Sequence, residues 1–176
     1  MKRKAVFFDR DGVINVDHAY VYDPKDFEFV SGIFDLLSFF KSRAYLLIVV
    51  TNQSGIARGY YSIEDFLKLT DYMQERFRAK LGFCFDKVYF CPHLSGCKCR
   101  KPEIGMFEEA CRDFEIDLEE SIMIGDKESD MQAAQNAGVN KKYFLTLKNP
   151  SYLTQITNLK WAISLTQIKN FEEQGA

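Results

Sequence analysis

Features that would point to a membrane protein or a nucleic-acid binder are missing from this sequence. No stretch approaches the roughly 18 consecutive apolar residues that a membrane-spanning helix needs. The apolar run Ala5–Phe8 stops at Asp9 and is too short for a secretion signal. No basic run is longer than Lys2-Arg3-Lys4 and the formal net charge is −2, which disfavours a nucleic-acid-binding face. We therefore expect a cytoplasmic protein with no membrane or nucleic-acid partner.

Linkers and low-complexity tracts are also scarce. The 176 residues include only 4 prolines and 10 glycines, and no internal repeat or Pro/Gly-rich linker interrupts them. Apolar residues make up 47% and charged residues 27% of the chain, which suits a protein with a core of its own. We expect a single domain over residues 1–176, present as a monomer, that needs no disulfide bonds for stability.

Strand-like apolar runs alternate with segments of helical spacing. The apolar residues between Ile33 and Phe40 follow the i, i+3, i+4, i+7 spacing of a helix with one apolar face. Tyr45–Val50 is apolar throughout, as is typical of a strand covered on both faces. This alternation predicts an α/β fold with a doubly wound, Rossmann-like, mostly parallel sheet. Strands are expected at 5–8, 45–50, 87–91, 121–125, 143–145 and 161–163, and helices at 33–40, 62–82, 107–114, 129–137 and after 164.

Polar clusters follow the first four expected strands, at the edge where open parallel sheets bind ligands. In the first cluster, the carboxylates of Asp9 and Asp11 are expected to point the same way and to repel each other unless a cation lies between them. Mg²⁺ is the natural partner, and Asp126 from a neighbouring strand end would complete its site. The alternative interpretation of Asp9–Gly12 is an ordinary turn, because Asp and Gly are common turn residues.

The second and third clusters offer hydrogen-bond donors and positive charge. The hydroxyl of Thr51 and the side-chain amides of Asn52 and Gln53 suit phosphate oxygens, although a helix cap or a polar turn would have the same composition. Arg100 and Lys101 supply a bidentate fork and a point charge for phosphate, while a solvated basic pair is the alternative. Together the clusters predict a crevice for an anionic small molecule.

Four potential metal ligands lie within nine residues. Cys91, His93, Cys97 and Cys99 form the Cys₃His set of a closed, structural zinc site. Four unrelated side chains, or a disulfide between Cys97 and Cys99, are the alternatives. A zinc ion at residues 91–99 would fold a loop that lacks its own core and would hold the following basic pair in place.

The motifs are recognisable as a set. Asp9–Val13, Thr51–Gln53, Lys101-Pro102 and Gly125-Asp126 resemble the four motifs of the haloacid-dehalogenase-like phosphatases. More narrowly, the segments Asp11–His18, Thr51–Gly59, Cys91–His93, Cys97–Pro102 and Gly125–Lys127 resemble the heptose-bisphosphate phosphatase branch, and the likeness extends to about Leu145. The histidinol-phosphate phosphatase branch shares the zinc loop and is the nearest alternative. Only three residues separate His93 from Cys97, which is shorter than in the heptose branch.

The resemblance implies a role for most of these side chains. Asp9 would be the nucleophile that forms an aspartyl-phosphate, and Asp11 the general acid/base. Asp9, Asp11 and Asp126 would hold catalytic Mg²⁺, while Thr51 and Lys101 would stabilise the transferring phosphoryl group. The substrate would be a sugar phosphate on the route to nucleotide-activated heptose, the lipopolysaccharide core precursor, bound in an open crevice without a large cap domain. Its other contacts would be Asp17, His18, Ala19, Tyr20, Asn52, Gln53, Ser54, Arg100 and Lys127.

A phosphoryl-accepting signalling module of the receiver type is the alternative from another class, because it also combines an α/β sheet with acidic residues and Mg²⁺. Such a module needs a phosphoacceptor Asp at the end of a middle strand and no leaving-group acid. Here the first strand is followed by Asp9-Arg10-Asp11, and the third ends in the Cys/His loop. The sequence therefore favours a phosphatase.

Overall fold

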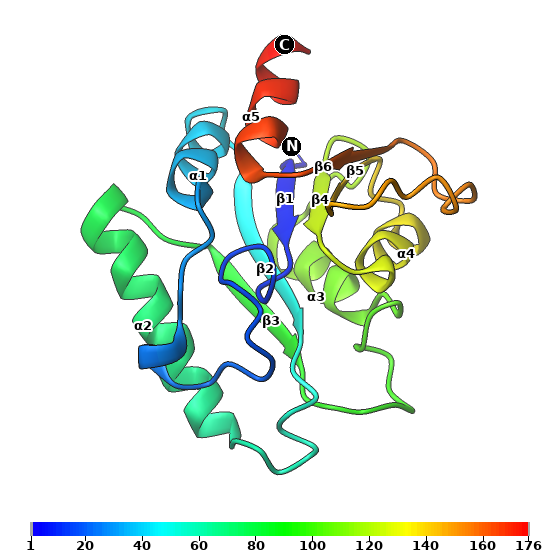
Figure 1. Cartoon of the computed structure of the whole chain (residues 1–176). Helices are drawn as coiled ribbons and strands as arrows, with labels where there is room; N and C mark the ends of the chain where they lie inside the picture. The colour runs from blue at the N-terminus through cyan, green and yellow to red at the C-terminus, as the bar shows by residue number, and fades with distance from the viewer. Residues whose placement is uncertain (1, 176) are drawn as a thin grey trace.

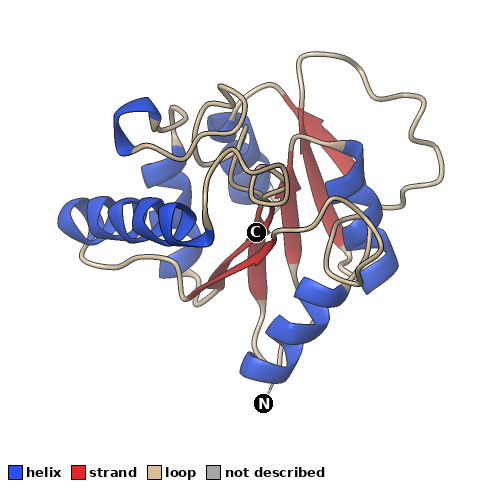
Figure 2. Cartoon of the chain, turned by 90° about the horizontal axis from the view of Figure 1, so that it is seen from below, coloured by secondary structure: helices blue, strands red, loops and turns tan. Residues whose placement is uncertain are grey.

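Strand β1 (Ala5–Phe8) shows why the sheet is covered on both faces. Val6 and Phe8 pack into one hydrophobic core, whereas Ala5 and Phe7 pack into a second core on the opposite face. All four side chains are fully buried, because successive residues of a strand point to opposite faces. The computed structural model describes residues 2–175, and Figures 1 and 2 show the sheet between its two layers of helices.

Six parallel strands form the sheet in the order β3-β2-β1-β4-β5-β6. The chain winds from β1 towards one edge and from β4 towards the other, so the direction of winding changes between these two strands. Ligands bind at such a switch point, beyond the carboxyl ends of the strands. The remaining strands are β2 (Leu46–Asn52), β3 (Lys87–Cys91), β4 (Ile122–Gly125), β5 (Lys141–Leu145) and β6 (Leu159–Ala162).

The helices divide between the two faces. One core contains buried residues of α1 (Ile33–Ser42), α2 (Ile63–Leu81) and α5 (Leu165–Gln174). The other contains buried residues of α3 (Gly105–Phe114) and α4 (Glu128–Ala137). The expected fold class, a doubly wound parallel sheet, is confirmed.

The helices and strands begin and end within a few residues of the positions predicted from the sequence. Helix α2 begins after Ser62, whose hydroxyl accepts the backbone N–H of Asp65 while the Asp65 carboxylate accepts that of Ser62. Strand β6 begins two residues before the predicted start at Trp161. The short 3₁₀ helix Pro24–Asp26 was not predicted, since three residues carry no periodicity. Within residues 2–175, no helix combines the length and apolar character required to cross a bilayer.

Candidate active site

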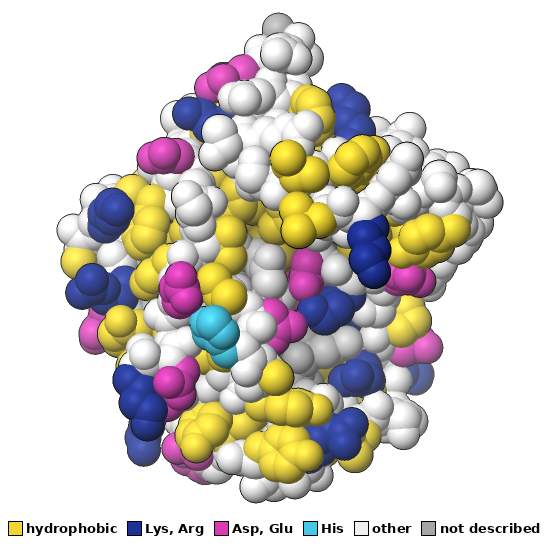
Figure 3. Space-filling model, viewed as in Figure 1, with side chains coloured by type: hydrophobic (Ala, Val, Ile, Leu, Met, Phe, Trp, Pro, Cys, Tyr) yellow, Lys and Arg dark blue, Asp and Glu magenta, His cyan; other side chains and the backbone are white. Residues whose placement is uncertain are grey.

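Asp9 lies directly after β1, in the crevice where the winding changes direction. Its Oδ1 accepts a 2.9 Å hydrogen bond from Nζ of Lys101. The same Nζ lies 2.7 Å from Oδ1 of Asp130 and donates to the carbonyl of Val50. Asp9 is 7% exposed and Lys101 only 2%, so this network is largely shielded from water. Figure 3 shows acidic and basic side chains gathered around a hollow at the centre of this face.

The charges of this network shift one another's protonation. Burial and the neighbouring carboxylate of Asp130 raise the pKa of Asp9 to about 8, although Lys101 opposes the shift. Burial acts to lower the pKa of Lys101, but the carboxylates of Asp130 and Asp9 outweigh it and raise that pKa above its ordinary value. Two buried carboxylates around one ammonium leave an excess of negative charge, which a further cation would offset.

The residues beside Asp9 suit such a cation. Carboxylate oxygens of Asp9, Asp126 and Asp130 all lie within 4.8 Å of one another. Oδ1 of Asp126 is buried and has no hydrogen-bond partner among the described residues. Gly12, at φ +91°, admits this carboxylate, because a Cβ there would lie 2.1 Å from Asp126 Oδ2. Carboxylate oxygens are the ligands that Mg²⁺ prefers, and an unpartnered buried oxygen is costly. The donor set therefore fits a magnesium ion.

Asp11 has different surroundings. Its Oδ1 accepts hydrogen bonds from Nη2 of Arg10 at 2.9 Å and from Nδ2 of Asn15 at 3.0 Å. Its Oδ2 accepts from Nε2 of Gln53 at 3.0 Å and from Nε of Arg10 at 3.2 Å. Four N–H groups thus hold this carboxylate in one orientation.

The sequence predicts Asp9, Asp11 and Asp126 as metal ligands, and the role of Asp11 as a ligand stays a prediction. The structure brings together Asp9, Asp126 and Asp130, and Asp11 is not part of the group. An extended chain would have pointed Asp9 and Asp11 the same way. The chain instead turns after Asp9, with the carbonyl of Arg10 accepting the backbone N–H groups of the three residues from 13 to 15. In this turn the Asp11 carboxylate accepts hydrogen bonds from Arg10, Asn15 and Gln53, outside the group that contains Asp9.

A cavity of about 360 Å³ opens at the carboxyl ends of the strands, a size suited to a small ligand. All but one of the predicted substrate contacts line it. The exception is His18, whose Nε2 lies 3.3 Å from Oε2 of Glu28 outside the cavity. The lining residues are Asp9, Asp11, Asp17, Ala19, Tyr20, Asn52, Gln53, Ser54, Tyr61, Arg100, Lys101, Lys127, Ser129 and Asp130.

The residues at the end of β2 and Gln53 just after it hold neighbouring side chains in place. Nδ2 of Asn52 donates to the carbonyl of Lys101, and Oδ1 of Asn52 accepts the backbone N–H of Lys101. This reciprocal pair ties the end of β2 to the loop that carries the buried lysine. Thr51 is 1% exposed, and its Oγ1 accepts from Nε2 of Gln53 at 2.8 Å. The side-chain amides of Asn52 and Gln53 are therefore part of the framework of the cavity.

Sequence reasoning missed Asp130, Ser129 and Tyr61, which also line the cavity. Asp130 had a detectable signal, since an acid at the third position of α4 is typical of a helix start. Its Oδ2 accepts the backbone N–H groups of Asp126 and Lys127. Tyr61 had none, because only the tertiary fold brings the residue before Ser62 to the cavity.

The Cys/His loop that follows β3 forms a second cluster. Nδ1 of His93 and the sulfur atoms of Cys91, Cys97 and Cys99 all lie within 4.8 Å of one another. Most of the pairs are separated by 3.3–3.6 Å, close to the edge of about 3.5–3.8 Å of a tetrahedron with zinc-ligand bond lengths. Although burial acts to raise it, backbone N–H groups of Arg100 and Cys99 lower the pKa of Cys97 to about 6, whereas burial raises the pKa values of Cys91 and Cys99. The four expected ligands are thus together.

Comparisons with known proteins agree with this geometry. The family model described as HAD-hydrolase-like matches residues 98–146. The D-glycero-alpha-D-manno-heptose-1,7-bisphosphate 7-phosphatase of Campylobacter jejuni is 50% identical over 97% of this chain and 99% of its own length. The D-glycero-beta-D-manno-heptose-1,7-bisphosphate 7-phosphatase of Helicobacter pylori is 49% identical over 97% of this chain and 94% of its own.

A solved structure extends the likeness to the whole fold. The D,D-heptose 1,7-bisphosphate phosphatase from B. bronchiseptica, complexed with magnesium and phosphate, aligns with a TM-score of 0.84 and 30% identity. The alignment covers 98% of this chain and 99% of that structure. Sequence and fold agree over nearly the full length of both proteins. The chain therefore belongs to the haloacid-dehalogenase-like phosphatases and is a phosphoric monoester hydrolase.

Proposed function

We propose that this phosphatase removes the 7-phosphate of D-glycero-D-manno-heptose 1,7-bisphosphate. The observation that carries the proposal is the 50% identity, over nearly all of both chains, with the Campylobacter jejuni relative named for this reaction. The cavity beyond the sheet supports it, because it has room for a small ligand and places Asp9, Asp11, Arg100 and Lys101 around that space.

In the first chemical step, a carboxylate oxygen of Asp9 attacks phosphorus and the bond from phosphorus to the sugar oxygen breaks. Asp11 donates a proton to the departing sugar oxygen. Water then attacks the aspartyl-phosphate while Asp11 accepts a proton from it, which releases inorganic phosphate and restores the Asp9 carboxylate. The different surroundings of the two carboxylates support this division of labour, since Asp9 faces the charged network and Asp11 lies among neutral amides and Arg10.

The other predicted residues supply charge and orient the phosphate groups. Lys101 and the Thr51 hydroxyl stabilise the transferring phosphoryl oxygens, and Arg100 contacts the second phosphate. Phosphatases of this family use Mg²⁺, and here Asp9 and Asp126 would hold the ion with Asp130 beside them. When bound, the ion supplies positive charge to the phosphoryl oxygens. The buried, unpartnered Oδ1 of Asp126 supports this assignment.

A structural zinc ion is the second cofactor that we propose. Its ligands would be Cys91 at the end of β3 and His93, Cys97 and Cys99 in the loop between β3 and α3. The ion would stiffen a loop in which only Cys91 is fully buried. Because Arg100 and Lys101 follow the last ligand directly, the ion would hold the positive end of the crevice in position.

Phosphate release from purified protein tests the substrate. The panel contains the α and β anomers of the heptose 1,7-bisphosphate together with histidinol phosphate, each with Mg²⁺. We expect kcat/KM for one heptose anomer to exceed that for histidinol phosphate by at least about 10²-fold. A preference for histidinol phosphate would overturn the assignment. The Asp9→Asn variant is the control for contaminating phosphatases.

A further inference from the structure

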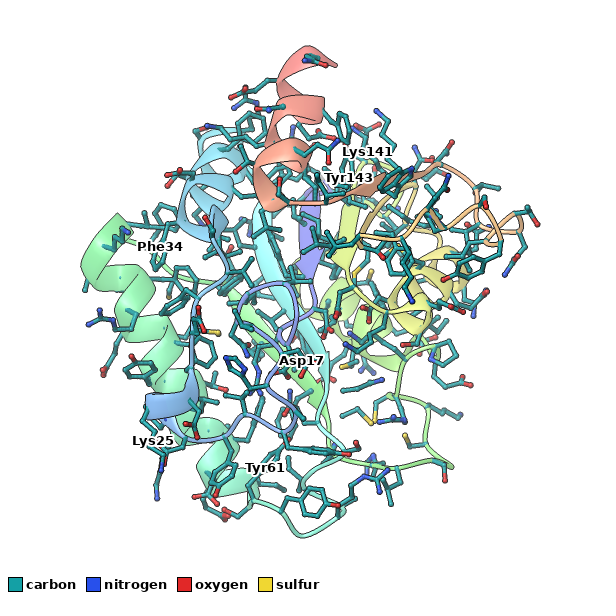
Figure 4. All side chains as sticks on the ribbon, in the orientation of Figure 1. Asp17, Lys25, Phe34, Tyr61, Lys141 and Tyr143 are labelled. Carbon is teal, nitrogen blue, oxygen red and sulfur yellow. The ribbon has the colours of Figure 1, made fainter. Side chains whose placement is uncertain are left out.

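We propose that Tyr61 is a positioning residue for proton transfer, because it fixes the side-chain amide of Gln53 that holds Asp11. The inference rests on the proposed function, which makes Asp11 the general acid/base. Tyr61 is labelled in Figure 4, in the segment between β2 and α2. No motif in the sequence singles it out.

A chain of hydrogen bonds leads from Tyr61 to Asp11. The phenol oxygen of Tyr61 lies 2.6 Å from Oε1 of Gln53. Nε2 of Gln53 in turn donates to Oδ2 of Asp11 at 3.0 Å and to Oγ1 of Thr51 at 2.8 Å. Gln53 is 2% exposed and Tyr61 is 7% exposed, so water has little access to the amide.

The phenol group is a suitable partner for the carbonyl end of that amide. Burial raises the pKa of Tyr61 to about 12, so its hydroxyl remains a neutral O–H donor. With this donor on Oε1, both hydrogens of Nε2 are free to face acceptors, and Asp11 and Thr51 provide them. Without the hydroxyl, Oε1 of Gln53 would be a buried acceptor without a donor. Because this is unfavourable, we expect the Gln53 side chain to change its orientation.

The ring of Tyr61 is held on two sides. A Cβ on Gly55 would lie 2.2 Å from Cε1 of the ring, so the absence of a side chain at residue 55 creates the space that the ring fills. The ring of Tyr22 stacks on it, with centroids 5.4 Å apart and planes inclined by 14°. Tyr61 therefore has little freedom to follow Gln53 if that side chain moves.

Gln53 is the donor that joins Asp11 to the sheet. The other donors to the Asp11 carboxylate are Arg10 and Asn15, which belong to the same turn as Asp11 itself. Gln53 instead follows β2 and binds Thr51 at the end of that strand. Among the described residues, the Gln53 amide is thus the connection that fixes the position of the Asp11 carboxylate relative to the strand ends, and Tyr61 fixes that amide.

The dependence of the rate on the leaving group tests the proposal. A sugar oxygen must be protonated as it departs, whereas 4-nitrophenolate leaves without a proton. In Tyr61→Phe, we expect the single-turnover rate with the heptose bisphosphate to fall about tenfold. The single-turnover release of 4-nitrophenol from 4-nitrophenyl phosphate should change less than about twofold. Gly55→Ala, which displaces the ring without removing the hydroxyl, should give the same pattern.

A matched control is Tyr89→Phe, because Tyr89 is a buried residue of β3 whose hydroxyl donates to Asp113 of α3. Both of its rates should stay at the wild-type value. Equal slowing of the two substrates in Tyr61→Phe, or no slowing of either, would overturn the proposal.

Asp11→Asn separates this inference from the proposed function. This variant should lose at least about 10²-fold with the heptose bisphosphate and far less in the release of 4-nitrophenol. Equal losses in Asp11→Asn would refute the proton-transfer role of Asp11 itself. A leaving-group effect in Asp11→Asn that is absent from both Tyr61→Phe and Gly55→Ala would overturn only the role of Tyr61.

Discussion

The two clusters of potential metal ligands are built in opposite ways. Asp9 and Asp130 are almost completely buried, and they follow strands or begin a helix whose side chains fill the cores. In the Cys/His loop, His93 is exposed and Cys97 and Cys99 are only half-buried, and the loop joins β3 to α3 without regular structure. The sheet therefore positions the carboxylate cluster. In the Cys/His loop, by contrast, the ligands themselves would hold the loop in place when they bind a metal ion.

Because of this difference, we expect substitutions in the two clusters to affect catalysis and stability to different degrees. A change in the carboxylate cluster should alter the reaction and leave the fold in place, because the strands beneath it do not depend on those carboxylates. A change in the Cys/His loop should loosen the loop first and reach the reaction through Lys101, the residue that links the two clusters. Lys101 follows the last cysteine by two positions, yet its ammonium group lies between Asp9 and Asp130.

The largest expected effect is on turnover in Asp9→Asn. We expect kcat to fall by at least about 10³-fold, because the amide cannot act as the nucleophile. The melting temperature of the metal-free protein should not fall, since the change removes one of the two buried carboxylates around Lys101. Steady-state kinetics and thermal unfolding measure the two quantities. A large loss of stability would contradict the contrast between the clusters.

Cys97→Ser should affect stability more than Asp9→Asn does and turnover less. We expect the bound zinc to be lost and the melting temperature to fall by about 5 °C or more, since each kcal/mol corresponds to about 2–4 °C in a domain of this size. Turnover should fall about tenfold, and the Mg²⁺ concentration for half-maximal activity should stay the same. Elemental analysis, thermal unfolding and a Mg²⁺ titration provide the measurements.

The control for that variant is Cys111→Ser. Cys111 is a half-buried thiol on α3 that is not part of the Cys/His cluster. Its replacement should leave the zinc content unchanged. If Cys97→Ser matches this control in zinc content, stability and turnover, the loop does not depend on a metal ion.

Gly12→Ala sharpens the comparison within the carboxylate cluster. The added Cβ would meet Oδ2 of Asp126 at 2.1 Å in a backbone conformation with φ +91°. We expect the free energy of unfolding to fall by about 1–3 kcal/mol and the Mg²⁺ concentration for half-maximal activity to rise several-fold. Chemical denaturation and Mg²⁺ titration check the two effects. Gly82→Ala is the matched control, because Gly82 has φ +79° but nothing lies within 4 Å of the added Cβ. This variant should lose stability without a change in the Mg²⁺ concentration for half-maximal activity.

The smallest expected effect concerns the ion pair between Asp17 and Lys127 at the rim of the crevice. Both side chains are more than a third exposed, so Asp17→Asn should cost about 0.5 kcal/mol or less, and less still in high salt. Although burial opposes it, hydrogen bonds from Lys127 and from the backbone of Ala19 lower the pKa of Asp17. The stabilisation is therefore present above the ordinary pKa of 3.8 and is lost as the pH falls through the lowered value. Denaturation of both proteins from pH 6 to pH 2 measures it, and a difference that grows in acid would contradict the assignment.

Much of the site could be predicted from the order of residues along the chain. The polar residues after β1, β2 and β4 converge because neighbouring parallel strands end at the same edge of a sheet. The cluster from Cys91 to Cys99 could be predicted because its ligands are close in sequence. The partners of the Asp11 carboxylate could not be predicted, since they depend on a turn held by the carbonyl of Arg10 and on Gln53.

By itself, the sequence determined the strand–helix alternation, the parallel sheet, the family motifs and the local grouping of the cysteines. These features follow from periodicity and short spacing, which act over a few residues at a time. The tertiary structure alone decided that Asp130 joins Asp9 and Asp126, that His18 lies outside the cavity, and that Tyr61 holds Gln53. Such contacts depend on the packing of distant segments and on close approaches such as Gly12 on Asp126, which leave no periodic trace in the sequence.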